Sequence, residues 1–210
     1  MKYIKFILIL VLAAALLCGC GAELKKEDIT GTWIGTGTAK QNTATQLLEI
    51  INLCDVEKDF VDLNTLKYQK CVKFTEKGKY IFSLDVEASK HYVREFYEGV
   101  MAALYENRKE LNEVYSVVFD DMTQDEFYQF YADMYNFSDY EMMITAFVER
   151  AYDYDKMAEK RSRGKYTIDG PVLVCTPEDA EKETILGCEV DGDTMKLLYA
   201  NSVEIYTFVE

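Results

Sequence analysis

The stretch Gly164-Lys165-Tyr166-Thr167-Ile168-Asp169-Gly170 alternates apolar with polar side chains and ends in Asp-Gly. A period of two places the apolar residues on one face of a strand, and Asp-Gly is a preferred pair for a two-residue hairpin turn. The same pattern returns at Cys188-Glu189-Val190-Asp191-Gly192-Asp193. The carboxyl-terminal part of the chain therefore predicts consecutive β-hairpins, with partner strands at 172–175, 195–199 and 203–209.

The first half of the chain predicts a further hairpin and a core residue of the sheet. Residues 68–74 and 79–84 alternate in the same way around Glu76-Lys77-Gly78, where Gly78 can supply a positive φ. Upstream, Ile29-Thr30-Gly31-Thr32-Trp33 begins the fold, and a single tryptophan there is typical of a side chain that closes one end of a sheet or barrel. Residues 43–54 suit a short helix or a buried strand, and we favour a helical turn.

Between these β portions the hydrophobic period changes from two to 3.6 at about residue 86, which predicts helices. Apolar side chains at helical spacing from Val93 to Val118 predict one long helix. Capping boxes at 123–126 and 138–141 predict helices that start near Gln124 and Asp139. The last apolar stripe ends in Lys160, Arg161 and Arg163 before Gly164, a pattern typical of a helix carboxyl terminus with a left-handed cap.

Together, the start at 29–33, the hairpin at 74–80, and the two Asp-Gly stretches resemble small bacterial lipocalin-like lipoproteins. The resemblance covers residues 29–40, 66–85 and 164–210. It implies an antiparallel meander that closes into a small barrel, in a family largely without assigned activity. We therefore expect an α+β fold: a small antiparallel meander sheet or lipocalin-like barrel with a three-helix insertion at about 86–163, within a β domain of residues 29–210.

The amino-terminal segment has the features of an export signal. Lys2 and Lys5 precede an apolar run over 6–17, which is shorter than the roughly 20 residues of a membrane-spanning helix. The run ends in Leu17-Cys18-Gly19-Cys20, which resembles the cleavage box of bacterial lipoproteins. The resemblance implies a signal peptide over 1–19, a lipid on Cys20, a linker over 20–28, and a place on the extracytoplasmic face of the bacterial cell membrane.

The net charge limits the partners of the chain. It is −14 for the whole sequence, and the loss of Lys2 and Lys5 with the signal lowers it to −16. Such a chain is repelled by nucleic-acid backbones and by anionic lipid surfaces. We therefore expect no nucleic-acid partner, and a membrane association that depends on the lipid at Cys20.

Four cysteines remain beyond Cys20. An exported chain can form disulfides, and a hairpin would place Cys175 opposite Cys188 and leave Cys54 for Cys71. The alternative is that all four are small buried apolar side chains. None has the Cys-x-x-Cys spacing of zinc or redox sites, so we expect no metal and no cofactor.

Candidate catalytic residues are few. His91 is the single histidine, and we expect it on a helix surface because no activated Ser or Cys accompanies it. Gly35-Thr36-Gly37 lacks the helix that a phosphate-binding loop needs. Paired carboxylates, as in glycosidases, occur at four places, which the acidic composition makes expected by chance: Asp120 and Asp121, Asp153 and Asp155, Glu178 and Asp179, and Asp191 and Asp193.

The helical region is rich in Tyr and Phe between Tyr97 and Tyr140, which suits either a core or a binding surface. These observations predict a non-catalytic, lipid-anchored surface protein that binds a ligand or a protein partner. One alternative is a surface hydrolase that uses two carboxylates, and another is a structural subunit of an envelope or complex whose helical insertion docks another protein. The sequence assigns no catalytic residue and no ligand-binding residue to any of these functions.

Overall fold

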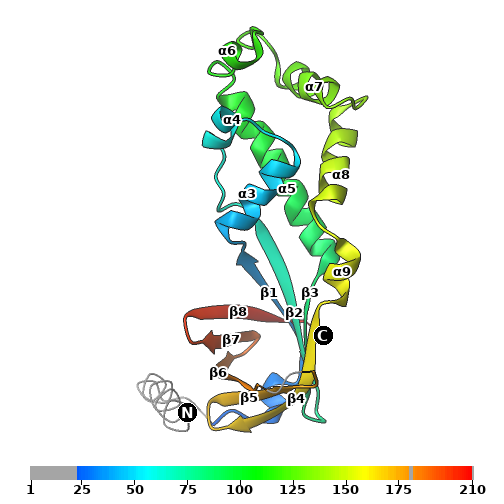
Figure 1. The fold of residues 1–210 in the computed structure, drawn as a ribbon. Coiled ribbons are helices and arrows are strands. Elements are labelled where there is room, and N and C mark those ends of the chain that lie inside the picture. Colours follow the sequence, from blue (N-terminus) through cyan, green and yellow to red (C-terminus); the bar gives the residue numbers. More distant parts are fainter. Residues whose placement is uncertain (1–22, 180–181, 210) are drawn as a thin grey trace. The chain divides into compact units, whose positions relative to one another are not determined.

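The computed structural model describes residues 23–179 and 182–209. Its β portion is a closed barrel of eight strands, each hydrogen-bonded to the next in chain order, with β8 returning to β1 (Figure 1). The expected α+β class with a lipocalin-like antiparallel barrel is confirmed. The strands are β1 (Gly31–Thr38), β2 (Lys67–Phe74), β3 (Lys79–Leu84), β4 (Arg161–Asp169), β5 (Val172–Pro177), β6 (Thr184–Asp191), β7 (Thr194–Tyr199) and β8 (Ser202–Val209).

Antiparallel register confirms the predicted hairpins. Asp169 pairs with Val172 around Gly170, and Asp191 pairs with Thr194 around Gly192. Both glycines have positive φ, of 58° and 55°. A positive φ is unfavourable for any residue that carries a Cβ, whereas glycine adopts it readily. This explains why an Asp-Gly pair lies at each of these turns.

The barrel interior is filled by large side chains. Trp33 is 1% exposed, and its indole Nε1 donates a 2.8 Å hydrogen bond to the carbonyl of Ile29, the last residue of α2 (Lys26–Ile29). Ile29 is itself fully buried in the same cluster, so α2 and Trp33 together cover part of the barrel core. The other buried members of the cluster are Leu24, Val72, Phe74, Tyr80, Tyr166, Leu173, Cys175, Leu186, Cys188, Met195, Leu197 and Tyr206.

Two groups of helices interrupt the strands. The first lies between β1 and β2 and was expected only as a helical turn: α3 (Gln41–Ile50) and α4 (Asp55–Asp59). The second lies between β3 and β4: α5 (Val86–Glu106), α6 (Asn112–Tyr115), α7 (Gln124–Met134), α8 (Tyr140–Ala151) and α9 (Tyr154–Glu159). The three longest helices of the second group are α5, α7 and α8.

The helix starts were predicted closely, because their caps are local. Thr123 accepts from the backbone N–H of Glu126, whose carboxylate accepts from the Thr123 N–H, as the capping box predicts. At α8 the cap is Asp139 rather than Ser138, since Oδ1 of Asp139 accepts from the N–H of Met142. The carboxylate replaces the hydroxyl as the acceptor at this helix start.

The prediction that the long helix reaches Val118 is wrong. The helix ends at Glu106, where the side-chain amide of Asn107 donates to the carbonyl of Ala103 and competes with continued helix formation. Similarly, the predicted last stripe breaks between α8 and α9, because Tyr152 is extended and Asp153 accepts from the N–H of Lys156.

The predicted left-handed cap at Gly164 is also wrong. Gly164 lies inside β4, opposite Pro177, and a Cβ there would stand 2.1 Å from the Thr176 carbonyl oxygen. The glycine is required by a close approach of two strands rather than by a helix end. Arg161 and Arg163, which were expected at the carboxyl terminus of a helix, are strand residues.

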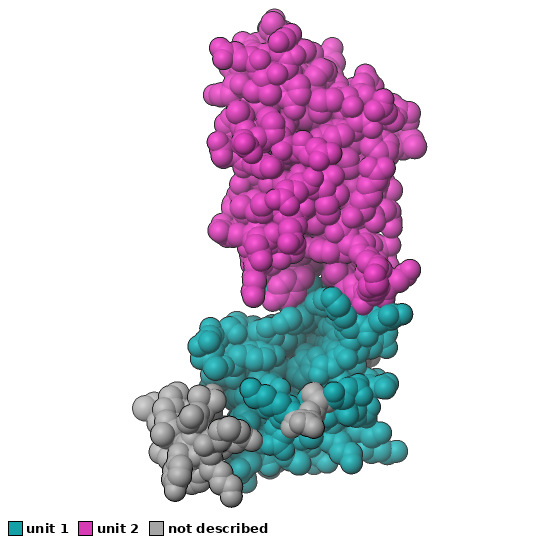
Figure 2. All heavy atoms as spheres, viewed as in Figure 1, with its two compact units in different colours: residues 1–37, 69–84, 159–210 teal, residues 38–68, 85–158 magenta. Residues whose placement is uncertain are grey.

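The chain divides into two compact units (Figure 2), which we call the barrel unit and the helical unit. The barrel unit contains residues 1–37, 69–84 and 159–210, and the helical unit contains 38–68 and 85–158. Over the described ranges, none of the helices has the length and apolar character needed to cross a membrane.

Candidate functional site

The segment between α5 and α7, together with the first residues of α7, presents an acidic surface with exposed apolar side chains. We call residues 110–126 the acidic tip. It contains no Lys or Arg, and Val114 and Val118 are 42% and 70% exposed. The carboxylates exposed around them are Glu110, Glu113, Asp120, Asp121, Asp125 and Glu126.

The tip is held in one conformation by hydrogen bonds to its backbone. Arg108 donates from Nε to the carbonyl of Phe119 at 3.2 Å and from Nη2 to that of Asp120 at 3.3 Å. Asn112 accepts from the N–H of Phe119 at 2.9 Å and donates to Asp120 Oδ1 at 2.9 Å. These four hydrogen bonds restrain the backbone of the tip on both sides of Phe119.

Phe119 explains why its neighbour Val118 is exposed. Phe119 is fully buried and packs edge-on against Phe127 of α7, with ring centroids 5.2 Å apart. With Phe119 directed into the core and its backbone fixed, the adjacent Val118 remains at the surface. An isolated exposed valine is ordinary, but two within five residues among six carboxylates make an amphipathic surface.

Beneath the tip, the helical unit contains a buried carboxylate that sequence reasoning missed. Glu57 of α4 is 1% exposed. Its Oε2 accepts from the N–H of Cys54 at 2.7 Å, and its Oε1 accepts from the hydroxyls of Tyr115 and Tyr131, each at 2.6 Å. We call these four residues the Glu57 cluster.

Burial is the main reason that the pKa values of Tyr115 and Tyr131 lie above the ordinary tyrosine value, and the neighbouring Glu57 raises them further. Both hydroxyls are therefore protonated and can donate to the carboxylate. No buried side-chain nitrogen or oxygen of the described chain lacks a hydrogen-bond partner. A carboxylate satisfied in this way stabilises the fold and leaves no free acceptor for chemistry.

The barrel interior holds a second polar cluster, formed by Lys70, Glu204, Tyr206 and Tyr199. Lys70 of β2 forms an ion pair with Oε1 of Glu204 of β8, although β1 lies between these strands in the sheet. The hydroxyl of Tyr206 donates to Oε2 of Glu204 at 2.6 Å. Burial alone would raise the pKa of Glu204, but hydrogen bonds from Lys70, Tyr206 and Tyr199 outweigh it and lower that pKa.

Gly35 of β1 makes room for this cluster. A Cβ at Gly35 would stand 2.8 Å from both the Ile205 carbonyl oxygen and the Tyr206 ring. The absent side chain lets the ring of Tyr206 lie against β1. Gly35 thus has a packing role, which the sequence did not reveal.

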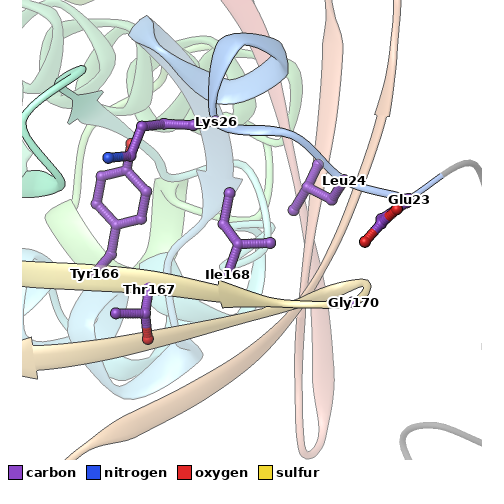
Figure 3. Close-up of a pocket in the computed structure, with 7 residues that line it drawn as sticks. All are labelled: Glu23, Leu24, Lys26, Tyr166, Thr167, Ile168 and Gly170. Carbon is purple, nitrogen blue, oxygen red and sulfur yellow. The ribbon is translucent and has the colours of Figure 1, made fainter.

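A pocket of about 380 Å³ lies on the barrel unit, where the amino-terminal segment runs beside β4 (Figure 3). Leu24, Tyr166 and Ile168 give it apolar walls, and Glu23 and Lys26 give it one charge of each sign. Thr167 and Gly170 complete the lining. These seven residues include no Ser, Cys or His and no pair of carboxylates.

The residues that the sequence suggested for catalysis are dispersed. His91 is 65% exposed on α5, where its Nε2 lies 3.2 Å from Glu95. Asp153 is bonded to Lys156, Glu178 to Arg163, and Asp191 and Asp193 flank the β6–β7 turn. Within the described part of the chain, no three His, Cys, Asp or Glu side chains gather in a way that could hold a metal ion.

The four cysteines that the structure describes are free thiols. Cys175 pairs with Thr184 across the β5–β6 hairpin, and the N–H of Cys188 bonds to the Pro171 carbonyl. Cys175 and Cys188 therefore do not face each other across this hairpin, contrary to the expectation that led to their pairing. The disulfides Cys175–Cys188 and Cys54–Cys71 stay predictions, and Cys20 lies outside the described residues.

Most aromatic side chains of the helical unit belong to its core. Tyr97, Phe127, Tyr131 and Phe147 are at most 2% exposed. Tyr128 and Tyr140 are only half-buried and stack with their ring centroids 4.4 Å apart. The density of aromatics is thus explained mainly by packing.

Comparison with known proteins gives no family assignment. No family model, no curated protein and no solved structure matches the chain. The residues and their geometry alone therefore support the proposals below.

Proposed function

We propose that this protein is a non-catalytic lipoprotein of the bacterial cell surface, anchored through Cys20, whose helical unit binds a basic protein or peptide. The observation that carries this proposal is the separation of charge between the two units. The helical unit has 22 Asp and Glu against nine Lys and Arg, whereas residues 20–37, 69–84 and 159–210 have 15 against 12.

The acidic tip is the part of the helical unit best suited to contact such a partner. Its carboxylates attract cationic side chains and raise the rate of encounter. Val114 and Val118 add apolar contact area, and the restrained backbone supports both. An amphipathic basic segment matches this combination of charge and apolar surface.

Anchoring at Cys20 rests on the cleavage box that ends in Leu17-Cys18-Gly19-Cys20. The described fold begins only a few residues later, with α2 at Lys26. One acyl chain binds a membrane weakly, so stable anchoring needs at least two. The native protein is therefore expected to begin at a diacylated Cys20, and intact mass spectrometry of membrane-extracted protein would detect this. An unmodified terminus upstream of Cys20 would contradict the anchor.

The partner proposal is tested with two fluorescent peptides in which leucines recur at helical spacing. The other positions are Lys in one peptide and Glu in the other. Fluorescence anisotropy is expected to show binding of the Lys peptide only, weakening as salt rises because charges are screened. The double variant Glu113→Lys, Asp121→Lys should weaken binding at least about tenfold. Equal binding of both peptides, or of neither, would overturn the proposal.

A matched control changes the net charge equally but elsewhere. The double variant Glu183→Lys, Asp193→Lys reverses the charge at two exposed positions of the barrel unit. This variant should keep binding within about twofold of the unaltered protein, because the altered charges lie outside the acidic tip. If both double variants weaken binding equally, net charge rather than the tip is responsible.

A further inference from the structure

The outward face of β2, β3 and β4 carries five cations. We call Lys73, Lys79, Arg161, Arg163 and Lys165 the basic face. All five side chains are exposed, while the alternate residues of these strands, such as Phe74, Tyr80 and Tyr166, point into the barrel core. The alternation of a strand therefore places every one of these charges on the same side of the sheet.

The register of the sheet places two of these cations directly opposite each other. Lys79 pairs with Lys165, and Arg163 pairs with Ile81, which in turn pairs with Lys73. Like charges directly opposite on neighbouring strands destabilise a sheet. An anion outside the fold would offset this repulsion.

Two of the five cations, Arg161 and Arg163, have interaction partners. Arg163 bonds to Glu178 through Nε at 3.0 Å. Lys73, Lys79 and Lys165 make no ion pair with any carboxylate that the structure describes. The basic face is therefore a region of positive potential on a chain whose net charge is strongly negative.

The amino-terminal segment connects the basic face to the expected anchor. The Nζ of Lys26 lies beside Gly78, in the turn between β2 and β3. Glu23 and Leu24 run beside Ile168 and Gly170, at the end of β4 (Figure 3). The chain that leads from Cys20 thus meets the barrel next to the strands that carry the cations.

We propose that the basic face docks on the anionic headgroups of the bilayer in which Cys20 is anchored. The orientation that this gives the barrel rests on the proposed lipid anchor, but the attraction to anionic lipid does not need it. Each Lys or Arg held near an anionic membrane contributes about fivefold in affinity, and the attraction falls off within a Debye length. The repulsion expected from net charge alone is overcome locally, because charge is unevenly distributed over the chain.

The test uses the mature chain from residue 21, without signal or lipid. Every buried residue of both cores lies at position 24 or later, so this chain keeps the whole described core. It is sedimented with vesicles of phosphatidylcholine alone, or with about 30% phosphatidylglycerol, at about 50 mM and about 500 mM NaCl. Binding is expected to the anionic vesicles at low salt, with loss of most of it at high salt.

The variant Lys79→Glu with Lys165→Glu should weaken vesicle binding at least about 20-fold. The matched control Lys40→Glu with Lys109→Glu makes the same change in net charge on exposed residues of the helical unit, and should bind within about threefold of the unaltered chain. Circular dichroism verifies that both variants fold. Replacing opposed lysines by a like-charged pair keeps the repulsion between the two positions, so the comparison isolates the sign of the charge.

Binding to neutral vesicles, no binding to anionic vesicles, or equal loss in both double variants would overturn the docking. Inorganic phosphate, at an ionic strength matched with NaCl, should not compete. Competition beyond that control would point to a soluble phosphate ligand instead of a lipid surface and would also overturn it. Because this chain carries no lipid, the result is independent of whether mass spectrometry finds a modified Cys20.

Discussion

The hydroxyl of Tyr131 donates a 2.6 Å hydrogen bond to Oε1 of Glu57, 74 residues earlier in the chain. This bond joins α4, inserted between β1 and β2, to α7, inserted between β3 and β4. The helical unit is thus held together by a buried polar contact between its two separate segments, in addition to its apolar core.

We expect Glu57→Ala to lower the free energy of unfolding by about 3–5 kcal/mol, because the buried Tyr131 hydroxyl and the partly buried Tyr115 hydroxyl lose their acceptor. Urea unfolding followed by circular dichroism at 222 nm measures the loss. Tyr131→Phe, which removes one donor and keeps the ring, should cost about 1–3 kcal/mol. An alanine variant within 1 kcal/mol of the unaltered protein would contradict a structural role for the Glu57 cluster.

Gly35→Ala and Gly99→Ala should change stability in opposite directions. A Cβ at Gly35 meets the Ile205 carbonyl and the Tyr206 ring at 2.8 Å, so we expect a loss of about 1–3 kcal/mol from strain in the barrel. At Gly99, inside α5, no atom lies within 4 Å of the added Cβ, and alanine should gain about 0.5–1 kcal/mol. Chemical denaturation measures the free energy of unfolding of both variants under the same conditions, and each variant serves as the control for the other.

The Glu204 carboxylate should make stability depend on pH at the acidic end. Its pKa is lowered in the folded state, so its contribution is present above the unfolded value of about 4.3 and disappears as pH falls through the folded value. Glu204→Gln should therefore lower Tm by about 2–4 °C at pH 7, and by less below pH 4. A Tm difference that stays constant from pH 7 to pH 3 would contradict this assignment.

Cys175 and Cys188 should resist alkylation in the folded protein. Burial raises the pKa of each thiol to about 12, and the reactive thiolate is therefore scarce at neutral pH. Mass spectrometry after iodoacetamide treatment is expected to find both modified only after unfolding, whereas half-buried Cys71 reacts earlier. The same experiment tests the predicted disulfides, because oxidised cysteines would stay unmodified even in urea without reductant.

The strands were predictable because their signals are local. Asp169-Gly170 and Asp191-Gly192 fix two hairpins through a turn conformation that few other residues adopt. Closure into a barrel was expected only through family resemblance. The pairing that produces it, Trp33 with Phe208, joins residues near opposite ends of the sequence.

The polar clusters could not be predicted, because each depends on distant partners. The bond from the Cys54 N–H to Glu57 is local, but nothing in the neighbouring sequence connects Glu57 to Tyr115. Similarly, the sequence shows Lys79 and Lys165 as two of many lysines, and only the register of β3 with β4 makes them neighbours. The early end of α5 was missed because the apolar spacing continues through Leu111 into a segment that is not helical throughout.

The pairing of β1 with β8 has a consequence for the order in which the protein can assemble during synthesis. A chain made from its amino terminus delivers all segments of the helical unit before β5 to β8 emerge. Contacts between sequence-distant residues form slowly because a long loop must close first. The helical unit can therefore complete its own core while the sheet is still an open fragment with exposed edges, and the barrel becomes a finished structure only with the arrival of its last eight-residue strand.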